Sequence, residues 1–410
     1  MRAAVLALVV VVAAFLGGFF ALAVGKGAGW LDGGTTTTLI PVSDGAADDN
    51  VTAADAPGTA VPLPGNVFDP REIYRARSGG VVTIIALFGG PAAAGEGGAS
   101  QGSGFVVSPK GYILTNSHVI TTAGEGSPSE SAEAAETVYV EFRDGDRVEA
   151  EIVGWDIFDD VGLLKVDPAD HALVQVPLGD SSRVVVGEPV AAIGSPFGQE
   201  TSLTVGVVAA TERSIDSLTS EYSLVDAIQT DAPINRGNSG GPLFDARGRA
   251  IGINAQIRSE SGNAEGVGFA VPINSARRSM SQLIATGEVR YAYVGITTQT
   301  VTPSIAARFD YGAERGAAIQ DVNSGTPAAD AGFRPGGAEQ VFEDIRIKPG
   351  GDLIVAIDGK AVDTADDVVR AVTTRLPGQE LTFTIVRGAQ RRTITVTLGT
   401  RPEIPPGSGR

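Results

Sequence analysis

The sequence predicts a mainly β protein with an N-terminal transmembrane helix, in which antiparallel barrels or a sandwich precede a smaller α+β domain. Between residues 80 and 272, short β-branched runs are separated by Gly, Pro, Asp and Asn, a pattern typical of antiparallel sheets. Long helices do not alternate with these runs, which argues against a doubly wound parallel sheet. At 410 residues and 43% hydrophobic composition, the chain is long enough for two or three domains with hydrophobic cores.

Charge and composition exclude several classes of function. The formal net charge is −17, whereas a nucleic-acid-binding protein needs a basic face to displace counterions. The chain has no cysteine, so disulfides and thiolate metal sites are impossible. Its two histidines are far apart and no H-E-x-x-H motif occurs, which argues against a metallohydrolase. We therefore expect polypeptide partners, no nucleic acid, and neither a cofactor nor a metal.

The N-terminal segment is apolar. Residues 3–24 carry no charge, lie between Arg2 and Lys26, and are long enough to cross a bilayer as a helix. A cleaved signal peptide is the alternative, because residues 21–23 resemble a cleavage site, although the apolar region of a signal peptide is usually shorter. We expect residues 1–26 to form an uncleaved single-pass anchor that leaves the body outside the cytoplasm. Secretion after cleavage is the alternative.

The anchor is followed by a linker and then by the first ordered elements. Residues 27–66 are rich in Gly, Thr, Ala, Asp and Pro, which predicts a disordered tether. A short helix is predicted at residues 70–78 and a strand at residues 80–87. Further strands are predicted at residues 104–107, 112–115, 137–142, 147–155, 161–166 and 248–257.

Ser239 is a candidate nucleophile. It lies in residues 230–243, which read TDAPINRGNSGGPL, and the small residues around it let backbone amides approach as an oxyanion hole requires. The pattern G-x-S-x-G also occurs in α/β-hydrolases, where the histidine follows the serine. Here both His118 and His171 precede Ser239, which leaves the order His, acid, Ser of the double β-barrel serine proteases.

His118 is the candidate base. A hairpin that turns at residues 108–111 brings it just past a strand ending near Thr115. An imidazole titrates near neutral pH, so it can take the proton of a serine and return it to a leaving amine. His171 lies in the polar turn at residues 167–171, and we expect it to be solvated.

An acid is needed to hold the histidine in one tautomer. Asp156, Asp159 and Asp160 all precede the apolar strand predicted at residues 161–166. Asp160 directly precedes that strand, and it is preferred because this position matches that of the acid in the family whose resemblance is described below. We expect Asp156 and Asp159 to be turn or surface carboxylates. The spacing along the chain allows the acid and the base to come from one barrel and the serine from a second.

These motifs resemble the HtrA family of serine proteases, through residues 111–119 (GYILTNSHV) and 230–243, over roughly residues 70–400. The resemblance implies a chymotrypsin-like double β-barrel protease domain at residues 67–288. The implied triad is His118, Asp160 and Ser239, and the implied oxyanion hole is Gly237, Asn238 and Ser239. The implied wall of the substrate pocket is Ile234, Gly268, Phe269 and Ala270. No charged residue is identified at the base of that pocket, which favours a small aliphatic P1 residue. Residues 121–136 and 210–223 are expected to be surface loops.

Residues 289–400 resemble a PDZ domain, and residues 401–410 are expected to be a disordered tail. The implied carboxylate-binding loop is Tyr293, Val294, Gly295 and Ile296, whose amides would hold the C-terminus of a peptide. Thr364 is a candidate N-cap in a capping box. Residues 337–349 depart from the family as an insertion that lengthens the approach to the next strand.

The resemblance implies an ATP-independent serine endopeptidase that cleaves misfolded or signalling proteins outside the cytoplasm. It also implies a PDZ domain that binds peptide C-termini and modulates activity, and assembly as a homotrimer. A peptide-binding chaperone or scaffold with little proteolytic activity is the alternative, and the presence of all three triad residues favours the protease.

Overall fold

The computed structural model describes residues 68–89, 98–123, 132–195, 201–220, 222–235, 237–255 and 267–403. The predicted membrane anchor and linker therefore lie outside the described residues, as does most of the predicted tail. Within the described ranges, no helix is long and apolar enough to cross a membrane.

A capped helix opens the described chain. The Asp69 side chain accepts hydrogen bonds from the backbone amides of Arg71 and Glu72, and Pro70 occupies the first turn, so helix α2 (Pro70–Arg77) begins there. This confirms the helix predicted at residues 70–78. The short helix η1 (Ser78–Gly80) then leads into the first strand.

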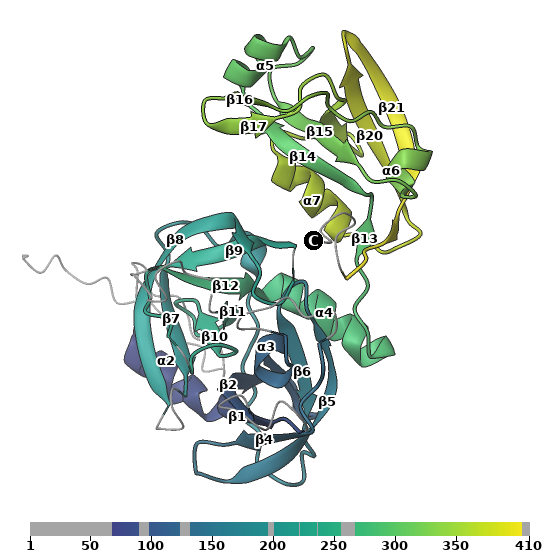
Figure 1. The fold of residues 1–410 in the computed structure, drawn as a ribbon. Coiled ribbons are helices and arrows are strands. Elements are labelled where there is room, and N and C mark those ends of the chain that lie inside the picture. The colour runs from purple at the N-terminus through teal and green to yellow at the C-terminus, as the bar shows by residue number, and fades with distance from the viewer. Residues whose placement is uncertain are drawn as a thin grey trace, which may run out of the picture. The chain divides into compact units, whose positions relative to one another are not determined.

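The first barrel follows. Its strands are β1 (Val81–Leu87), β2 (Ala99–Val106), β3 (Tyr112–Thr115), β4 (Thr137–Glu141), β5 (Arg147–Asp156) and β6 (Val161–Lys165), with helix α3 (Ser117–Ile120) after β3. They close in the order β1-β2-β3-β6-β5-β4, with antiparallel pairing throughout (Figure 1). In β4, Val138 and Val140 are buried while Tyr139 between them is not, which is the alternation of a strand with one face on a core.

The second barrel repeats this architecture. It contains η3 (Ser181–Arg183), β7 (Pro189–Gly194), β8 (Ser202–Asp216), β9 (Ser223–Thr230), β10 (Pro242–Phe244), β11 (Ala250–Ala255) and β12 (Gly268–Pro272), and helix α4 (Ile273–Thr286) follows. These strands close in the order β10-β11-β12-β9-β8-β7. The predicted mainly β fold with barrels is confirmed.

The prediction of a surface loop at residues 210–223 is wrong for most of that segment. Strands β8 and β9 pair as a ribbon from Val208 to Asp216, with several register shifts. Glu212 and Asp226 have φ of 57° and 64°, left-handed values that accompany such irregularities. A ribbon exposes much of both faces, so polar side chains are compatible with strands there, and the polarity of the sequence misled the prediction.

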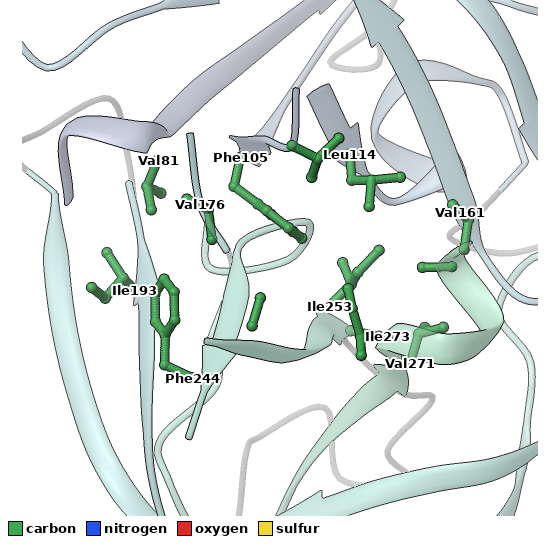
Figure 2. Packing of buried hydrophobic residues seen from close by; sticks show 14 of the residues in the cluster. Val81, Phe105, Leu114, Val161, Val176, Ile193, Phe244, Ile253, Val271 and Ile273 are labelled. Carbon is green, nitrogen blue, oxygen red and sulfur yellow. The ribbon is translucent and has the colours of Figure 1, made fainter. Parts of the chain in front are cut away.

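The two barrels share a hydrophobic core. Figure 2 shows residues of both barrels converging on it: Val81, Phe105, Leu114, Val161 and Val176 from the first half, and Ile193, Phe244, Ile253, Val271 and Ile273 from the second. All ten are at most 2% exposed. Each buried aliphatic or aromatic side chain contributes roughly 1.5–3 kcal/mol. We call this shared core the seam between the barrels. Segments that leave either barrel at the seam are therefore held firmly relative to one another.

The C-terminal domain is α+β, as predicted. Its elements are β13 (Ala292–Tyr293), β14 (Ile296–Val301), α5 (Pro303–Phe309), β15 (Gly316–Val322), α6 (Pro327–Asp330), β16 (Gln340–Phe342), β17 (Ile345–Ile347), β18 (Leu353–Ile357), β19 (Lys360–Ala361), α7 (Ala365–Thr373), β20 (Glu380–Arg387), β21 (Gln390–Thr397) and β22 (Gly399–Thr400). The main sheet runs β14-β15-β18-β20-β21, with β19 paired to β18. Thr364 and Asp367 form the predicted capping box at the start of α7.

The insertion at residues 337–349 forms a small hairpin of β16 and β17. Phe342 on this hairpin meets Phe309 of α5 edge to face, with ring centroids 5.9 Å apart. The insertion is thus an ordered addition that packs on its own domain.

Candidate active site

His118 and Asp160 come from the ends of two paired strands. Thr115, the last residue of β3, lies opposite Gly162 of β6, so the residues just beyond these positions meet. His118 Nδ1 lies 2.8 Å from Asp160 Oδ2. An ionised carboxylate only accepts hydrogen bonds, so this contact places the proton on Nδ1 and leaves Nε2 as the basic nitrogen.

The Asp160 carboxylate is held by further donors from the same barrel. Its Oδ1 accepts from the Ser117 hydroxyl at 2.8 Å and from the His118 amide at 3.1 Å. The Asn116 side chain donates to the Asp160 backbone carbonyl at 2.8 Å. Asp160 itself has φ of 51°, a left-handed conformation that costs energy for a residue with a side chain. The side chains of Asn116 and Ser117 and the backbone amide of His118 therefore fix the position and the orientation of the acid.

The prediction that Asp156 and Asp159 are turn or surface carboxylates is wrong about their exposure. Asp156 is 2% and Asp159 8% exposed. Ser279 of α4 and Tyr291 each donate a hydroxyl hydrogen bond of 2.6 Å to Asp156 Oδ2. These partners are more than 120 residues away along the chain, so no local sequence pattern could predict them.

Burial changes the acidity of both carboxyl groups. It raises the pKa of Asp156 to about 6, with the nearby Asp159 charge acting in the same direction. Burial also raises the pKa of Asp159. The other oxygen of Asp156, Oδ1, accepts from the amides of Phe158 and Asp159, at 2.9 and 3.3 Å. Asp156 therefore holds together the turn that ends at Asp160.

Ser239 lies on a tight turn between β9 and β10. The turn is braced by hydrogen bonds between the Gly240 amide and the Asn254 carbonyl, at 2.9 Å, and between the Asn254 amide and the Gly241 carbonyl, at 2.8 Å. Gly237 and Gly240 have φ of 98° and 85°, which favours glycine. Ser239 is 4% exposed, and its hydroxyl makes no hydrogen bond within the described part of the chain.

The turn packs against the histidine side of the first barrel. A Cβ built on Gly102 of β2 would lie 2.6 Å from Val119, the residue after His118, and 3.1 Å from the Ser239 carbonyl oxygen. A Cβ on Gly240 would lie 2.5 Å from the Thr115 hydroxyl. The structure thus brings the segments of all three predicted triad residues to one place on the seam between the barrels.

The predicted pocket wall is also brought together. Ile234 lies against Gly268, where an added Cβ would be 2.6 Å from the Ile234 Cγ1 atom. Phe269 and Ala270 follow on β12, and these two side chains and Ile234 are at most 7% exposed. In the predicted oxyanion segment, Asn238 is 3% exposed, and its side chain donates to the Pro233 carbonyl at 3.4 Å.

The predicted carboxylate-binding loop leads into the first strand of the main sheet of the C-terminal domain. Tyr293 belongs to β13, Val294 is 3% exposed, and Ile296 begins β14. Gly295 has φ of 90°, and a Cβ there would lie 2.3 Å from Thr326, so only glycine fits without rearrangement. Among the strands that the structure describes, β14 pairs with β15 alone in the main sheet, which leaves an edge to which an extended peptide can add.

His171 lies apart from this site, and the prediction that it is simply solvated is wrong. Its ring stacks on Phe142 with centroids 3.7 Å apart, and Nε2 lies 3.0 Å from Asp144. The hydrogen bond from His171 is the main cause of a lowered pKa for the exposed Asp144 carboxyl. The sequence shows that His171 lies in a polar turn, but it could not show that this turn packs against the Phe142 ring.

Comparison with known proteins agrees with this geometry. Residues 102–253 match the trypsin-like peptidase domain family, and residues 292–398 match the PDZ domain family. Proteins named probable periplasmic serine endoprotease DegP-like, from Halomonas elongata and Brucella suis, are 38% and 36% identical over 310 residues each. These matches cover 76% of this chain but only 58% and 54% of the relatives, so the chain spans little more than half of their length.

Solved structures give the same picture. The HtrA-type protease AlgW with a tripeptide is similar with a TM-score of 0.66 and 32% identity, over 83% of this chain and 100% of that chain. AlgW with a decapeptide is similar with a TM-score of 0.62 and 31% identity, over 82% and 99% of the two chains.

Proposed function

This chain belongs to the HtrA family of serine proteases, and we propose that it is a serine endopeptidase with Ser239 as nucleophile, His118 as proton carrier and Asp160 as the orienting acid. The observation that carries the proposal is the 2.8 Å contact of His118 Nδ1 with Asp160 Oδ2 beside the Ser239 turn. An imidazole held in this way presents a basic Nε2, and a serine hydroxyl needs such a base to become nucleophilic.

The reaction follows from these roles. The Ser239 oxygen attacks the carbonyl carbon of the substrate while His118 Nε2 takes the hydroxyl proton, and the Asp160 carboxylate stabilises the imidazolium. The oxygen of the tetrahedral intermediate accepts hydrogen bonds from the amides of Gly237 and Ser239, with Asn238 between them. Collapse breaks the peptide C–N bond, and the imidazolium protonates the leaving amine. Water then attacks the acyl-enzyme while His118 Nε2 takes one of its protons, and the imidazolium returns that proton to the Ser239 oxygen as the ester bond breaks.

The proposed substrate is a polypeptide with a small aliphatic P1 residue. The pocket wall of Ile234, Gly268, Phe269 and Ala270 carries no charge, so it offers no partner to a basic or acidic P1 side chain. Misfolded or signalling proteins are the proposed substrate class. A set of fluorogenic peptides that differ only at P1 tests this, and a preference for Arg or Lys would contradict it.

We propose that the PDZ domain binds peptide C-termini at Tyr293, Val294, Gly295 and Ile296 and modulates the protease. The edge strand β14 and the glycine turn before it support this proposal. Two similar AlgW structures contain a tripeptide and a decapeptide, respectively. Titration with a peptide and its C-terminally amidated form tests it, because only the free carboxylate should bind tightly.

The proposed organisation places an anchor at residues 1–26, a linker at 27–66, a protease domain at 67–288, a PDZ domain at 289–400 and a tail at 401–410. The body would lie outside the cytoplasm, in a homotrimer. The uncharged run at residues 3–24 and the family support this, and the relatives above are named periplasmic. N-terminal sequencing distinguishes an anchor from a cleaved signal, and sedimentation of the detergent-solubilised chain gives the oligomeric state.

Cleavage of β-casein by the full chain tests the proposed activity, with Ser239→Ala as the matched variant. We expect the wild-type chain to degrade casein and to react covalently with a fluorophosphonate at Ser239, and the variant to do neither. Equal casein loss in both would remove Ser239 as the nucleophile. Casein left intact by both, with aggregation suppressed, would indicate a peptide-binding chaperone instead.

A further inference from the structure

We propose that Ser103, on strand β2 of the first barrel, is a positioning residue for the Gly237-to-Ser239 turn of the second barrel. This inference rests on the proposed function, because the turn carries the nucleophile and the two amides assigned to the oxyanion. Ser103 acts through the backbone of the turn, since its hydrogen bonds reach main-chain atoms and not the side chains of the triad.

Ser103 bonds to both ends of the turn. Its hydroxyl donates to the Gly237 carbonyl, and its backbone amide donates to the Ser239 carbonyl at 2.8 Å. The Ser103 side chain is 0% exposed, so water does not compete for these bonds. The two peptide planes that flank Asn238 and Ser239 are therefore tied to one residue of the opposite barrel.

The turn needs such an anchor because of its glycine. Gly237 has φ of 98°, and a glycine in this region can rotate its peptide planes at little steric cost. An oxyanion hole works only if its donors already point at the developing charge. The Gly237 carbonyl shares its peptide plane with the Asn238 amide, which donates to the Asn235 carbonyl at 2.9 Å. This plane lies between the two planes that carry the Gly237 and Ser239 amides. The hydrogen bond from Ser103 therefore restrains both donors through the plane between them.

Ser103 is itself held in place by neighbours from several elements. The Ser195 amide donates to its hydroxyl oxygen at 2.8 Å, and the Thr83 hydroxyl donates to the Ser195 hydroxyl at 2.7 Å. The Thr115 hydroxyl donates to the Ser103 carbonyl at 2.7 Å, and Thr115 lies three residues before His118. Ser103 thus connects the end of strand β3, just before the base, with the turn that carries the nucleophile.

The turn also fits closely around Ser103. A Cβ on Gly240 would lie 2.1 Å from the Ser103 carbonyl oxygen, and one on Gly241 would lie 3.2 Å from the Ser103 Cβ. On the other side, a Cβ on Gly194 would lie 3.0 Å from the Ser103 hydroxyl. A side chain at any of these three glycines would therefore press against Ser103, so the close packing of the turn on Ser103 depends on them.

The test compares Ser103→Ala with the wild-type full chain on a fluorogenic peptide. Alanine removes the hydroxyl and keeps the backbone bond to Ser239. We expect kcat to fall about 10- to 100-fold with KM within about twofold, because the lost interaction orients groups that act in the transition state. A peptide aldehyde, whose adduct places an oxygen in the oxyanion hole, should bind more weakly by a similar factor, while a product-like peptide should bind unchanged.

Ser78→Ala is the matched control. Ser78 is also 0% exposed, and its hydroxyl accepts a hydrogen bond of 3.0 Å from Arg143, so the variant loses a buried hydroxyl away from the turn. It should keep kcat and aldehyde affinity. If Ser103→Ala does the same, or if both variants lose activity only in proportion to a lowered melting temperature, the positioning role is wrong.

Ser103→Cys covers the case in which the alanine variant does not fold. A thiol is a weak donor of similar shape, so we expect a folded protein whose kcat is at least about threefold below that of the wild type. Wild-type kcat with the thiol would contradict the proposal. The two hypotheses fail differently: a wild-type chain that neither cleaves the peptide nor reacts with a fluorophosphonate overturns the proposed function and this inference with it, whereas an active wild type with an equally active Ser103→Ala overturns the inference alone.

Discussion

The two barrels contribute to the site in different ways. The first barrel delivers a finished pair, because His118 and Asp160 are bonded to each other and the acid is held by Asn116 and Ser117 of the same barrel. The second barrel delivers Ser239 on a glycine-containing turn, and bonds from β11 and from Ser103 of the first barrel fix that turn. The positions of the base and the acid are thus fixed largely within one barrel, whereas the position of the nucleophile depends on contacts between the two barrels.

This difference separates two kinds of damage. Changes in the first barrel should alter proton transfer while the turn keeps its shape. Changes at the seam should alter the alignment of the nucleophile and the oxyanion donors while His118 keeps its bond to Asp160. The substitutions below test this division, beginning with the one of largest effect.

Ser239→Ala should abolish turnover, with a fall in kcat of about 10⁴-fold or more, because removal of a nucleophile leaves only binding and the oxyanion donors. The His118–Asp160 bond should survive, since Ser117 and the His118 amide hold the Asp160 carboxylate in place. Peptide hydrolysis and the ¹⁵N spectrum of labelled histidine check the two parts. A changed His118 tautomer in this variant would contradict the proposal that the His118–Asp160 pair is ordered independently of Ser239.

Asp160→Asn should lower kcat by roughly 10⁴-fold by favouring the wrong tautomer of His118. The amide can still accept from Ser117 and the His118 amide, so the fold should remain. Because the chain has only two histidines, and His171 contacts Asp144 instead, histidine resonances report on the change with an internal reference. Activity above about one hundredth of wild type would argue against Asp160 as the acid.

Gly240→Ala should lower kcat by about 10²- to 10³-fold, because the new Cβ meets the Ser103 carbonyl oxygen at 2.1 Å and must displace the turn. Gly145→Ala is the matched control, with φ of 87° against 85° but nothing within 4 Å of the added Cβ. The control should lose about 1–2 kcal/mol of stability from its backbone conformation and keep kcat. Equal kcat losses in the two variants would show that backbone strain, and not the contact with the Ser103 carbonyl oxygen, causes the loss of activity.

The smallest effect on catalysis is expected from Asp156, which affects the pH dependence of stability. Its partners Ser279 and Tyr291 come from distant parts of the chain. The pKa of Asp156 is raised to about 6 in the folded protein from 3.8, so the folded state binds this proton more tightly than the unfolded state. Its contribution to stability is complete below pH 3.8, declines as pH rises toward 6, and is lost above. Over that window the free energy of unfolding should fall by about 3 kcal/mol.

Denaturant unfolding of the wild type and of Asp156→Asn, from pH 4 to pH 8, measures this. The variant should show a flatter profile, with a remaining slope from Asp159, whose pKa is also raised. Ser279→Ala is the companion variant: its hydroxyl donates to Asp156, and loss of that donor should raise the pKa of Asp156 further. An unchanged slope in Asp156→Asn would mean that other groups cause the pH dependence.

Local patterns were enough to predict many of the elements. The alternation of strands, the helix at residues 70–78, the capping box at Thr364 and the candidate residues His118, Asp160 and Ser239 all depend on neighbours within a few positions. Asp160 could be chosen because it directly precedes an apolar run, as the acid does in the family that the sequence resembles, and the structure has it in contact with His118.

Other features depend on partners that a local pattern does not contain. The sequence by itself determined the β-rich architecture, the order of the domains and the residue types of the site, because periodicity and short motifs set backbone conformation within each element. Only the tertiary structure decided that Asp156 and Asp159 are buried, that residues 210–216 belong to a ribbon, and that Ser103 holds the turn of Ser239. The Ser103–Gly237 and Asp156–Tyr291 bonds join residues 134 and 135 positions apart, and such pairings form only when the barrels close and pack around their shared core.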